Sequence, residues 1–177
     1  MLKDIADFFV SKLIPSPDFN NKNQVRDTAL LVPEFYALVK KAIAKFNETY
    51  KGVEVVFVET YRSNALQLIH FNNGASKISK NGMHHYGIAV DCAFKVNGKF
   101  TYNGDYKLLR KCFQDVGLHL LGLWDMGHVQ YIPVDQQTAL RNAVDGAIKM
   151  FQREHGLIAD GIPGPKTIAK AKEIFGV

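Results

Sequence analysis

The segment GIAVDCAF at positions 87–94 is short and almost entirely apolar, yet it contains one acidic residue, Asp91. Its length and composition predict a buried β-strand, the element that most limits how this chain can fold. Because side chains alternate between the faces of a strand, Asp91 would share a face with Ala89 and Ala93. These small neighbours leave room for another group to approach the carboxylate. Asp91 is therefore either part of a site or an acid that is exposed or structurally paired.

Two further segments have strand patterns, and several have apolar residues at helical spacing. Strands are predicted at residues 53–59 (VEVVFVE) and 128–133 (HVQYIP). Helices are predicted near residues 1–13, 33–49, 63–74 and 105–117. Ser63 is suited to cap one of these helices and Gly74 to end it. The expected fold class is α+β: a small antiparallel sheet flanked by helices, followed by a C-terminal helical hairpin.

The chain has 177 residues, of which 47% are hydrophobic and 22% charged, a composition typical of soluble globular proteins. Its formal net charge of +5 is compatible with attraction to a polyanion such as nucleic acid, anionic lipid or an acidic cell wall. No dense block of Lys and Arg marks a nucleic-acid footprint, so a nucleic-acid partner is not expected. Cys92 and Cys112 lie in apolar patterns and are expected to be buried free thiols.

No targeting segment is recognisable in the sequence. The first residues, MLKDIADFFVSKL, contain charges that interrupt the apolar pattern, so they do not predict a signal peptide. No apolar run is long enough to span a membrane. These features predict a protein that is made in the cytoplasm, has no general export route of its own and does not insert into membranes. A monomer is expected.

Histidines occur on both sides of the predicted strand that holds Asp91. The adjacent pair His84 and His85 precedes it, and the chain must turn if either is to meet the carboxylate. His128 begins the last predicted strand, and Asp125 precedes it by three residues. Two histidines, one carboxylate and a spare acid are the parts of a catalytic zinc site.

Glycines stand where the chain would have to bend to bring these groups together. Gly87 lies between the histidine pair and Asp91, and Gly127 lies between Asp125 and His128. Because glycine adopts backbone conformations that other residues avoid, both positions predict turns.

The stretch HHYGIAVD fits the pattern His-x-x-Gly-x-Ala-x-Asp, and it resembles the zinc peptidases that cut bacterial cell-wall peptides. This group includes D-Ala-D-Ala carboxypeptidases and the L-alanyl-D-glutamate endopeptidases of many phage endolysins (VanY-like, LAS-type metallopeptidases). Upstream, ETYRSNALQLIHFNNGASK resembles the family segment with Tyr-Arg-Ser, a glutamine and Gly-x-Ser. Downstream, the family has an acid three residues before its last histidine, as here. The resemblance covers residues 53–133.

The resemblance implies a LAS/hedgehog-like zinc peptidase fold and a site that holds one Zn²⁺. The residues that resemble the zinc ligands are His84 (not His85), Asp91 and His128. Asp125 resembles the catalytic base, which would take a proton from the zinc-bound water and pass it to the leaving amine. Arg62 resembles the arginine that stabilises the developing negative charge.

Three further residues are candidates for substrate contacts. Gln67 falls at a recurring family position, and Trp124 is either a wall of the substrate pocket or a core residue. His85 is either a substrate contact, a support for the metal site, or an exposed residue at a strand edge. Gly82 departs from the family, which usually has serine there, and this bears on the substrate class. The segment LLGLWDMGH before the last histidine is also shorter than in the endopeptidase branch.

The C-terminal part of the chain differs in character from the rest. Its sequence resembles the peptidoglycan-binding module often joined to cell-wall hydrolases, with Phe-Gln and Asp-Gly-x-x-Gly positions, over about half of that module. The expected domains are a zinc peptidase domain at residues 1–133 and a short peptidoglycan-binding-like helical segment at residues 134–177. The alternative is a helical hairpin that only stabilises the fold.

The resemblance favours a zinc-dependent L-alanyl-D-glutamate endopeptidase that acts on bacterial peptidoglycan. Such a protein would be a phage or prophage endolysin, made in the host cytoplasm and acting on the cell wall after its release. One alternative is D-Ala-D-Ala carboxypeptidase activity. Another is a non-catalytic wall-binding or particle protein that keeps the fold, although the intact ligand set and Asp125 favour an enzyme.

Overall fold

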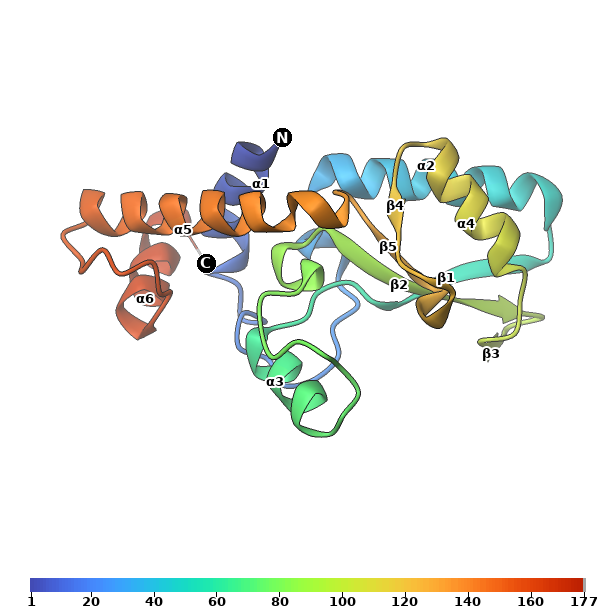
Figure 1. Ribbon diagram of the computed structural model, residues 1–177, viewed down its shortest axis with the longest axis horizontal. Coiled ribbons are helices and arrows are strands. Elements are labelled where there is room, and N and C mark those ends of the chain that lie inside the picture. The colour runs from blue at the N-terminus through green and yellow to red at the C-terminus, as the bar shows by residue number, and fades with distance from the viewer. Residues whose placement is uncertain (177) are drawn as a thin grey trace. The chain divides into compact units, whose positions relative to one another are not determined.

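The computed structural model describes residues 1–176, which belong to two units between which the chain passes back and forth (Figure 1). The sheet unit comprises Gln24–Tyr61 and Ile88–Pro133. The helical unit comprises Met1–Asn23, Arg62–Gly87 and, among the described residues, 134–176. Val177, the last residue of the predicted C-terminal segment, lies outside the described residues. The assignment of residues 1–133 and 134–177 to separate domains stays a prediction.

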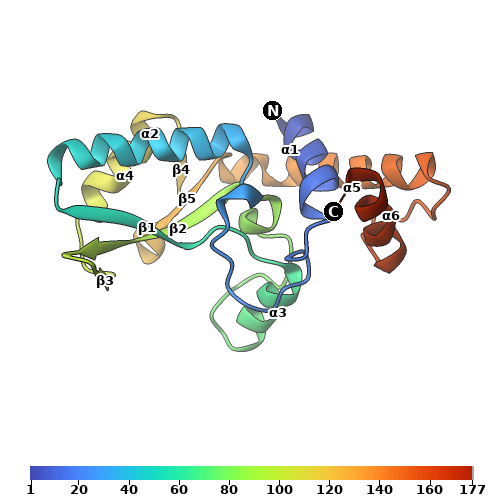
Figure 2. The same ribbon diagram turned by 180° about the vertical axis from the view of Figure 1, so that it is seen from behind.

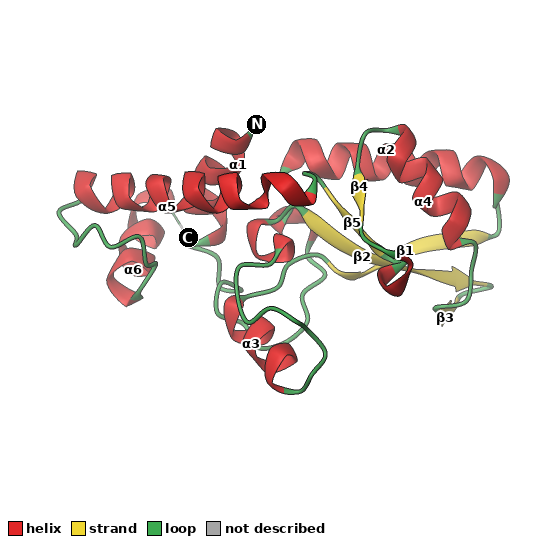
Figure 3. Ribbon diagram, in the orientation of Figure 1, coloured by secondary structure: helices red, strands yellow, loops and turns green. Residues whose placement is uncertain are grey.

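The sheet unit is built on an antiparallel sheet, which confirms the predicted α+β class (Figure 3). Its strands within residues 1–176 are β1 (Val53–Glu59), β2 (Ala89–Val96), β3 (Lys99–Thr101), β4 (His119–Leu120) and β5 (His128–Gln130). They lie in the order β1-β2-β5-β4, and β3 pairs with β2. The sequence did not predict β3 and β4, because strands of two or three residues are too short to show an alternating pattern.

The register of β2 places Asp91 between two other polar residues of the sheet. Asp91 is opposite His128 on β5 and opposite Glu59 on β1, after an irregularity in the β1 pairing. Glu59 is only 2% exposed, and the sequence had not singled it out. The strand around Asp91 is buried on both faces, since both Val90 and Ala93 are fully buried.

Two helices cover the sheet, α2 (Pro33–Thr49) and α4 (Tyr106–Asp115), and both were predicted. They pack against each other, while α2 also contacts β1 and α4 contacts β4 (Figure 1). Phe94 of β2 joins the layers: its ring centroid lies 5.7 Å from that of Phe46 on α2 and 4.8 Å from that of Tyr106 on α4. The cysteines, Cys92 and Cys112, are buried and free, as predicted.

The helical unit contains four α-helices in the described part of the chain (Figure 2). They are α1 (Leu2–Phe8), α3 (Asn64–Asn72), α5 (Gln137–Glu154) and α6 (Pro165–Phe175). A π-helical turn, Phe9–Leu13, extends α1, and a 3₁₀ helix, Met83–Tyr86, follows α3. Ser63 caps α3 as predicted, because its hydroxyl accepts a hydrogen bond from the N–H of Leu66.

The predicted C-terminal hairpin is present as α5 and α6, and it is packed into the helical unit. Helix α5 lies against α1, and α6 contacts the π-helical turn. The buried residues of α5 are Leu140, Val144, Ile148, Phe151 and Gln152. Arg141 of α5 also donates hydrogen bonds of 3.2 and 3.1 Å to the carbonyl oxygen of Asn81. Among the helices of residues 1–176, none has the length and apolar character needed to cross a membrane.

Candidate metal centre

The centre of the candidate site is a cross-strand pair formed by Asp91 and His128. Their Cα atoms are direct partners in the pairing of β2 with β5. Asp91 Oδ1 lies 3.0 Å from Nδ1 of His128. The side chain of His128 is only 7% exposed and that of Asp91 is 25% exposed. The imidazole is therefore held within the protein while the carboxylate is open to solvent on one side.

The second ring nitrogen of His128 has a partner of its own. Nε2 lies 3.1 Å from Oε1 of Gln130, and Nε2 of Gln130 donates a hydrogen bond of 2.7 Å to the carbonyl oxygen of Ile132. Both amide contacts are buried. The sequence analysis missed Gln130. The available signal was its position two residues after His128 on one strand, which places both side chains on the same face.

The acid beside the pair is Asp125, which ends a 3₁₀ helix, Leu123–Asp125. Its Oδ2 lies 4.0 Å from His128 Nδ1. Burial acts to lower the pKa of His128, but the hydrogen bond and charge of Asp91, the charge of Asp125 and the Gln130 hydrogen bond outweigh it. The net result is a raised pKa. The ring nitrogen that faces the carboxylates therefore favours a positively charged partner.

Gly127 fixes the distance between this segment and β2. The N–H of Cys92 donates a 2.9 Å hydrogen bond to the carbonyl oxygen of Gly127. A Cβ atom at Gly127 would lie 2.5 Å from the Cys92 carbonyl oxygen, so no other residue fits without a backbone shift. Gly127 was predicted to provide a bend, and the structure adds close contact between two backbones as the reason for a glycine there.

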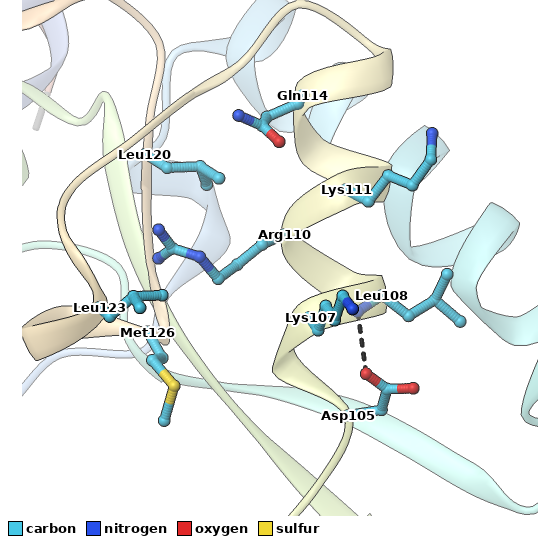
Figure 4. A pocket seen from close by; sticks show the side chains of 9 residues that line it. All are labelled: Asp105, Lys107, Leu108, Arg110, Lys111, Gln114, Leu120, Leu123 and Met126. Carbon is cyan, nitrogen blue, oxygen red and sulfur yellow. Dashed lines mark hydrogen bonds between the residues drawn. The ribbon is translucent and has the colours of Figure 1, made fainter.

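Arg110 of α4 holds the segment that carries Asp125. Its guanidinium donates hydrogen bonds of 2.6 Å to the carbonyl oxygen of Leu121 and 3.3 Å to that of Asp125. Arg110 extends from α4 toward Leu120 and Leu123 (Figure 4), and it lines a cavity of about 690 Å³. The residues around this cavity are Asp105, Lys107, Leu108, Arg110, Lys111, Gln114, Leu120, Leu123 and Met126. No sequence pattern indicates a role for Arg110, because its hydrogen-bond partners are backbone oxygen atoms of a loop 11 to 15 residues away.

Trp124 lies in the same segment and is 79% exposed. Its alternative interpretation as a core residue is therefore wrong. The neighbouring side chains of Leu123 and Met126 are 77% and 45% exposed. A role of Trp124 in binding substrate stays a prediction, and its exposure is compatible with that role.

His84 belongs to the 3₁₀ helix Met83–Tyr86 and is buried. Gly87 ends this helix with φ of +68°, a left-handed conformation, as the predicted turn requires. A possible ligand atom from each of His84, Asp91 and His128 lies within 4.8 Å of the other two. Two imidazoles and one carboxylate are a donor set that suits zinc, so these three residues form a group that could hold a metal ion.

His85, the other member of the histidine pair, is 3% exposed, so the expectation of an exposed strand-edge residue is wrong. Its ring lies among those of Phe9, Phe19 and Tyr86, with centroid distances of 5.2, 5.6 and 5.5 Å. Burial lowers the pKa of His85 to about 4, so the ring is neutral near pH 7. A substrate contact for His85 stays a prediction.

Gln67 of α3 is 2% exposed and connects Arg62 to the loop that follows the helix. Its Oε1 accepts a 3.2 Å hydrogen bond from the Arg62 guanidinium. Its Nε2 donates hydrogen bonds of 2.8 Å to both Ser76 Oγ and the Ile78 carbonyl oxygen. A Cβ atom at Gly82 would lie 3.3 Å from Gln67 Oε1, so the glycine gives this amide room. Gln67 is therefore placed to orient Arg62, and its contact with substrate stays a prediction.

Comparisons with known proteins point to the cell wall for one part of the chain. Residues 123–170 match the sequence profile of a family described as a putative peptidoglycan binding domain. This agrees with the predicted resemblance of the C-terminal segment, and the match begins earlier, at the segment that carries Asp125. The profile covers less than half of the chain. No curated protein matches the chain.

Among solved structures, the chain is similar to the crystal structure of Serratia marcescens L-Ala D-Glu endopeptidase ChiX. The sequence identity is 23%, the TM-score is 0.47, and the match covers 67% of this chain and 98% of that chain.

Proposed function

We propose that this protein is a zinc-dependent peptidase that cleaves the stem peptides of bacterial peptidoglycan. The observation that carries the proposal is the grouping of His84, Asp91 and His128 within 4.8 Å, with Asp125 Oδ2 4.0 Å from His128 Nδ1. Three ligands and a nearby acid that is not one of them are the arrangement of catalytic zinc sites, in which one coordination position stays open. The peptidoglycan-binding match at residues 123–170 supports the cell wall as the partner.

In this proposal the metal and the surrounding residues have separate roles in hydrolysis. Zinc, when bound, lowers the pKa of a coordinated water and polarises the scissile carbonyl. Asp125, whose side chain is 35% exposed, takes the proton from the attacking water and delivers it to the leaving amine. Arg110 holds the backbone of Asp125 in place during these transfers.

Arg62 supplies positive charge for the oxygen that becomes negative in the transition state. Its guanidinium is held by Gln67, whose remaining amide contacts tie it to the following loop. A charged group that is already oriented needs no rearrangement when the negative charge develops, and this lowers the barrier.

The bond that we propose is the link between L-alanine and D-glutamate. The support is the resemblance of YRSNALQLIHFNNGASK and HHYGIAVD to the endopeptidase branch. D-Ala-D-Ala cleavage is the alternative. An endolysin that is made in the host cytoplasm and reaches the wall after release is the biological role that we propose for this activity.

Purified sacculi test the proposal directly. We expect the protein to lower their turbidity, a chelator to stop the reaction, and added zinc to restore it. Mass spectrometry should find stem peptides that begin with D-glutamate, with L-alanine left on the glycan. Release of terminal D-alanine alone would instead identify a carboxypeptidase. Binding to sacculi with no peptide released in the presence of zinc would contradict an enzyme and favour a wall-binding protein.

A further inference from the structure

Gln130 follows His128 by two residues on β5, and its side chain lies on the same face of the strand. Its Cα partners are Ala89 on β2, which is fully buried, and His119 on β4. The Gln130 side chain is only 1% exposed. The amide therefore forms its hydrogen bonds with protein atoms rather than with bulk water.

The orientation of the Gln130 amide follows from its two partners. The carbonyl oxygen of Ile132, 2.7 Å from Gln130 Nε2, can only accept a hydrogen bond. The NH₂ group must therefore face Ile132, and Oε1 must face Nε2 of His128 at 3.1 Å. Rotating the amide by half a turn would place two acceptors against each other in a buried position, which is costly.

This orientation determines which nitrogen of His128 carries a proton. Because Gln130 Oε1 can only accept, Nε2 of His128 must donate and so must be protonated. An imidazole that binds a metal uses one nitrogen and keeps its proton on the other. The nitrogen left for a metal is Nδ1, which is the atom that faces Asp91 at 3.0 Å.

We propose that Gln130 is a positioning residue that keeps the proton of His128 on Nε2 and thereby offers Nδ1 to the metal. The inference rests on the proposed zinc site and adds to it the residue that selects the ligand atom. Without Gln130, His128 with metal bound at Nδ1 would lose the acceptor that its Nε2–H has here, and the ring would lose a contact that orients it. Partners of this kind typically change metal affinity by about 10–100-fold.

Three variants test this role through zinc affinity, measured by competition with a chromophoric chelator. Gln130→Met keeps the length of the side chain but replaces the amide oxygen by a weakly accepting sulfur, and we expect zinc affinity to fall by about 10–100-fold. Gln130→Glu keeps an acceptor oxygen for the Nε2–H of His128; when its other oxygen is protonated it can also donate to the Ile132 carbonyl oxygen, and in that form it should restore most of the affinity. Gln114→Met is the matched control, because Gln114 is exposed on α4, and it should bind zinc like the wild type.

Nitrogen NMR of the zinc-loaded protein, with ¹⁵N-labelled histidine, supplies a readout that does not depend on activity. We expect a slowly exchanging Nε2–H for His128 in the wild type, identified by its loss in His128→Gln. Exchange of this proton should be faster in Gln130→Met. If Gln130→Met fails to fold, the wild-type spectrum still decides the question.

The outcomes separate this inference from the proposed function. A proton on Nδ1 of His128, or wild-type zinc affinity in folded Gln130→Met, would overturn the role of Gln130 and leave the zinc site intact. The expected effects of Gln130 together with no cleavage of peptidoglycan would overturn the proposed activity alone. Failure of the wild type to bind zinc would overturn both.

Discussion

Asp91 and His128 are direct partners on neighbouring antiparallel strands, and Oδ1 of the first lies 3.0 Å from Nδ1 of the second. They are 37 residues apart in sequence, so the pairing of β2 with β5 brings them together. A slip of one residue in this register would turn one side chain to the opposite face of the sheet. Gly127, which contacts the backbone of Cys92, helps to hold the register.

The first prediction concerns the metal ligands. His84→Ala should lose zinc, because two protein ligands do not hold it as tightly as three. His85→Phe is the control: it replaces one ring by another among Phe9, Phe19 and Tyr86, and it should keep one zinc per chain. Metal analysis of the purified variants, with circular dichroism to verify folding, checks this. Full zinc content in His84→Ala would remove His84 from the site.

Asp125→Asn should separate metal binding from chemistry. The amide keeps the size of the side chain but cannot take a proton from water. We therefore expect normal zinc content and a loss of turnover of about 10²–10⁴-fold, the usual contribution of a general base. The assay is the release of peptides from sacculi. Near-normal turnover would show that another residue is the base.

Arg110→Met should reduce turnover without removing any group from the reaction. It deletes the hydrogen bonds to the carbonyl oxygens of Leu121 and Asp125, so the segment that carries the base becomes less well placed. A misplacement of this kind costs up to about 10²-fold in rate. Lys107→Met, at the rim of the same cavity, is the control and should keep its activity. Equal rates for the two variants would argue against the positioning role.

Asp105 should contribute stability in a pH-dependent way. Its carboxylate accepts hydrogen bonds from the N–H of Leu108 at the start of α4 and from the Tyr50 hydroxyl, and these lower its pKa. The ionised cap therefore stabilises the fold above the ordinary pKa of aspartate, and this contribution is lost as the pH falls through the lowered value. Asp105→Ala should lower the free energy of unfolding by about 1 kcal/mol at neutral pH.

Asp105→Asn is the control for charge, because asparagine also caps helices well. It should be more stable than Asp105→Ala, and its difference from the wild type should shrink in acid. Urea unfolding of the three proteins near pH 7 and at about pH 3 measures these differences. If the free energies of unfolding of the wild type and Asp105→Asn differ by the same amount at both pH values, the charge of Asp105 does not contribute to stability.

The wall-binding role proposed for the C-terminal segment can be tested on its surface. Ile158 and Ile162 are 82% and 65% exposed at the edge of a cavity of about 430 Å³. We expect replacement of both by serine to weaken sedimentation with sacculi and to leave the melting temperature unchanged. Ile174→Ser is the control, since Ile174 of α6 is 47% exposed and does not line this cavity. If the double variant at Ile158 and Ile162 sediments with sacculi as well as Ile174→Ser does, the protein does not bind the wall through this cavity.

Sequence patterns were sufficient for the longer elements and for the choice of candidate ligands. Helix α2 begins at Pro33 and ends at Thr49 as predicted, because its apolar stripe extends over several turns. Residues 84, 91 and 128 were candidates because their motifs resemble those of the zinc peptidases, and the structure brings a possible ligand atom of each within 4.8 Å of the others. A short motif can indicate such a group of residues because it includes the turn that brings its side chains together; in HHYGIAVD that turn is at Gly87.

The supporting contacts were decided by the tertiary structure. His85, next to a candidate ligand, is buried among aromatic rings that come from Phe9 and Phe19, far away in the sequence. Gln130 can orient His128 only because the fold places its amide between the His128 ring and the carbonyl oxygen of Ile132. Arg110 can hold the segment of Asp125 only because the fold places carbonyl oxygens of that loop beside its guanidinium. The sequence determines which groups are available for chemistry. Only packing decides their partners, because a hydrogen bond depends on distances and directions that the order of residues does not contain.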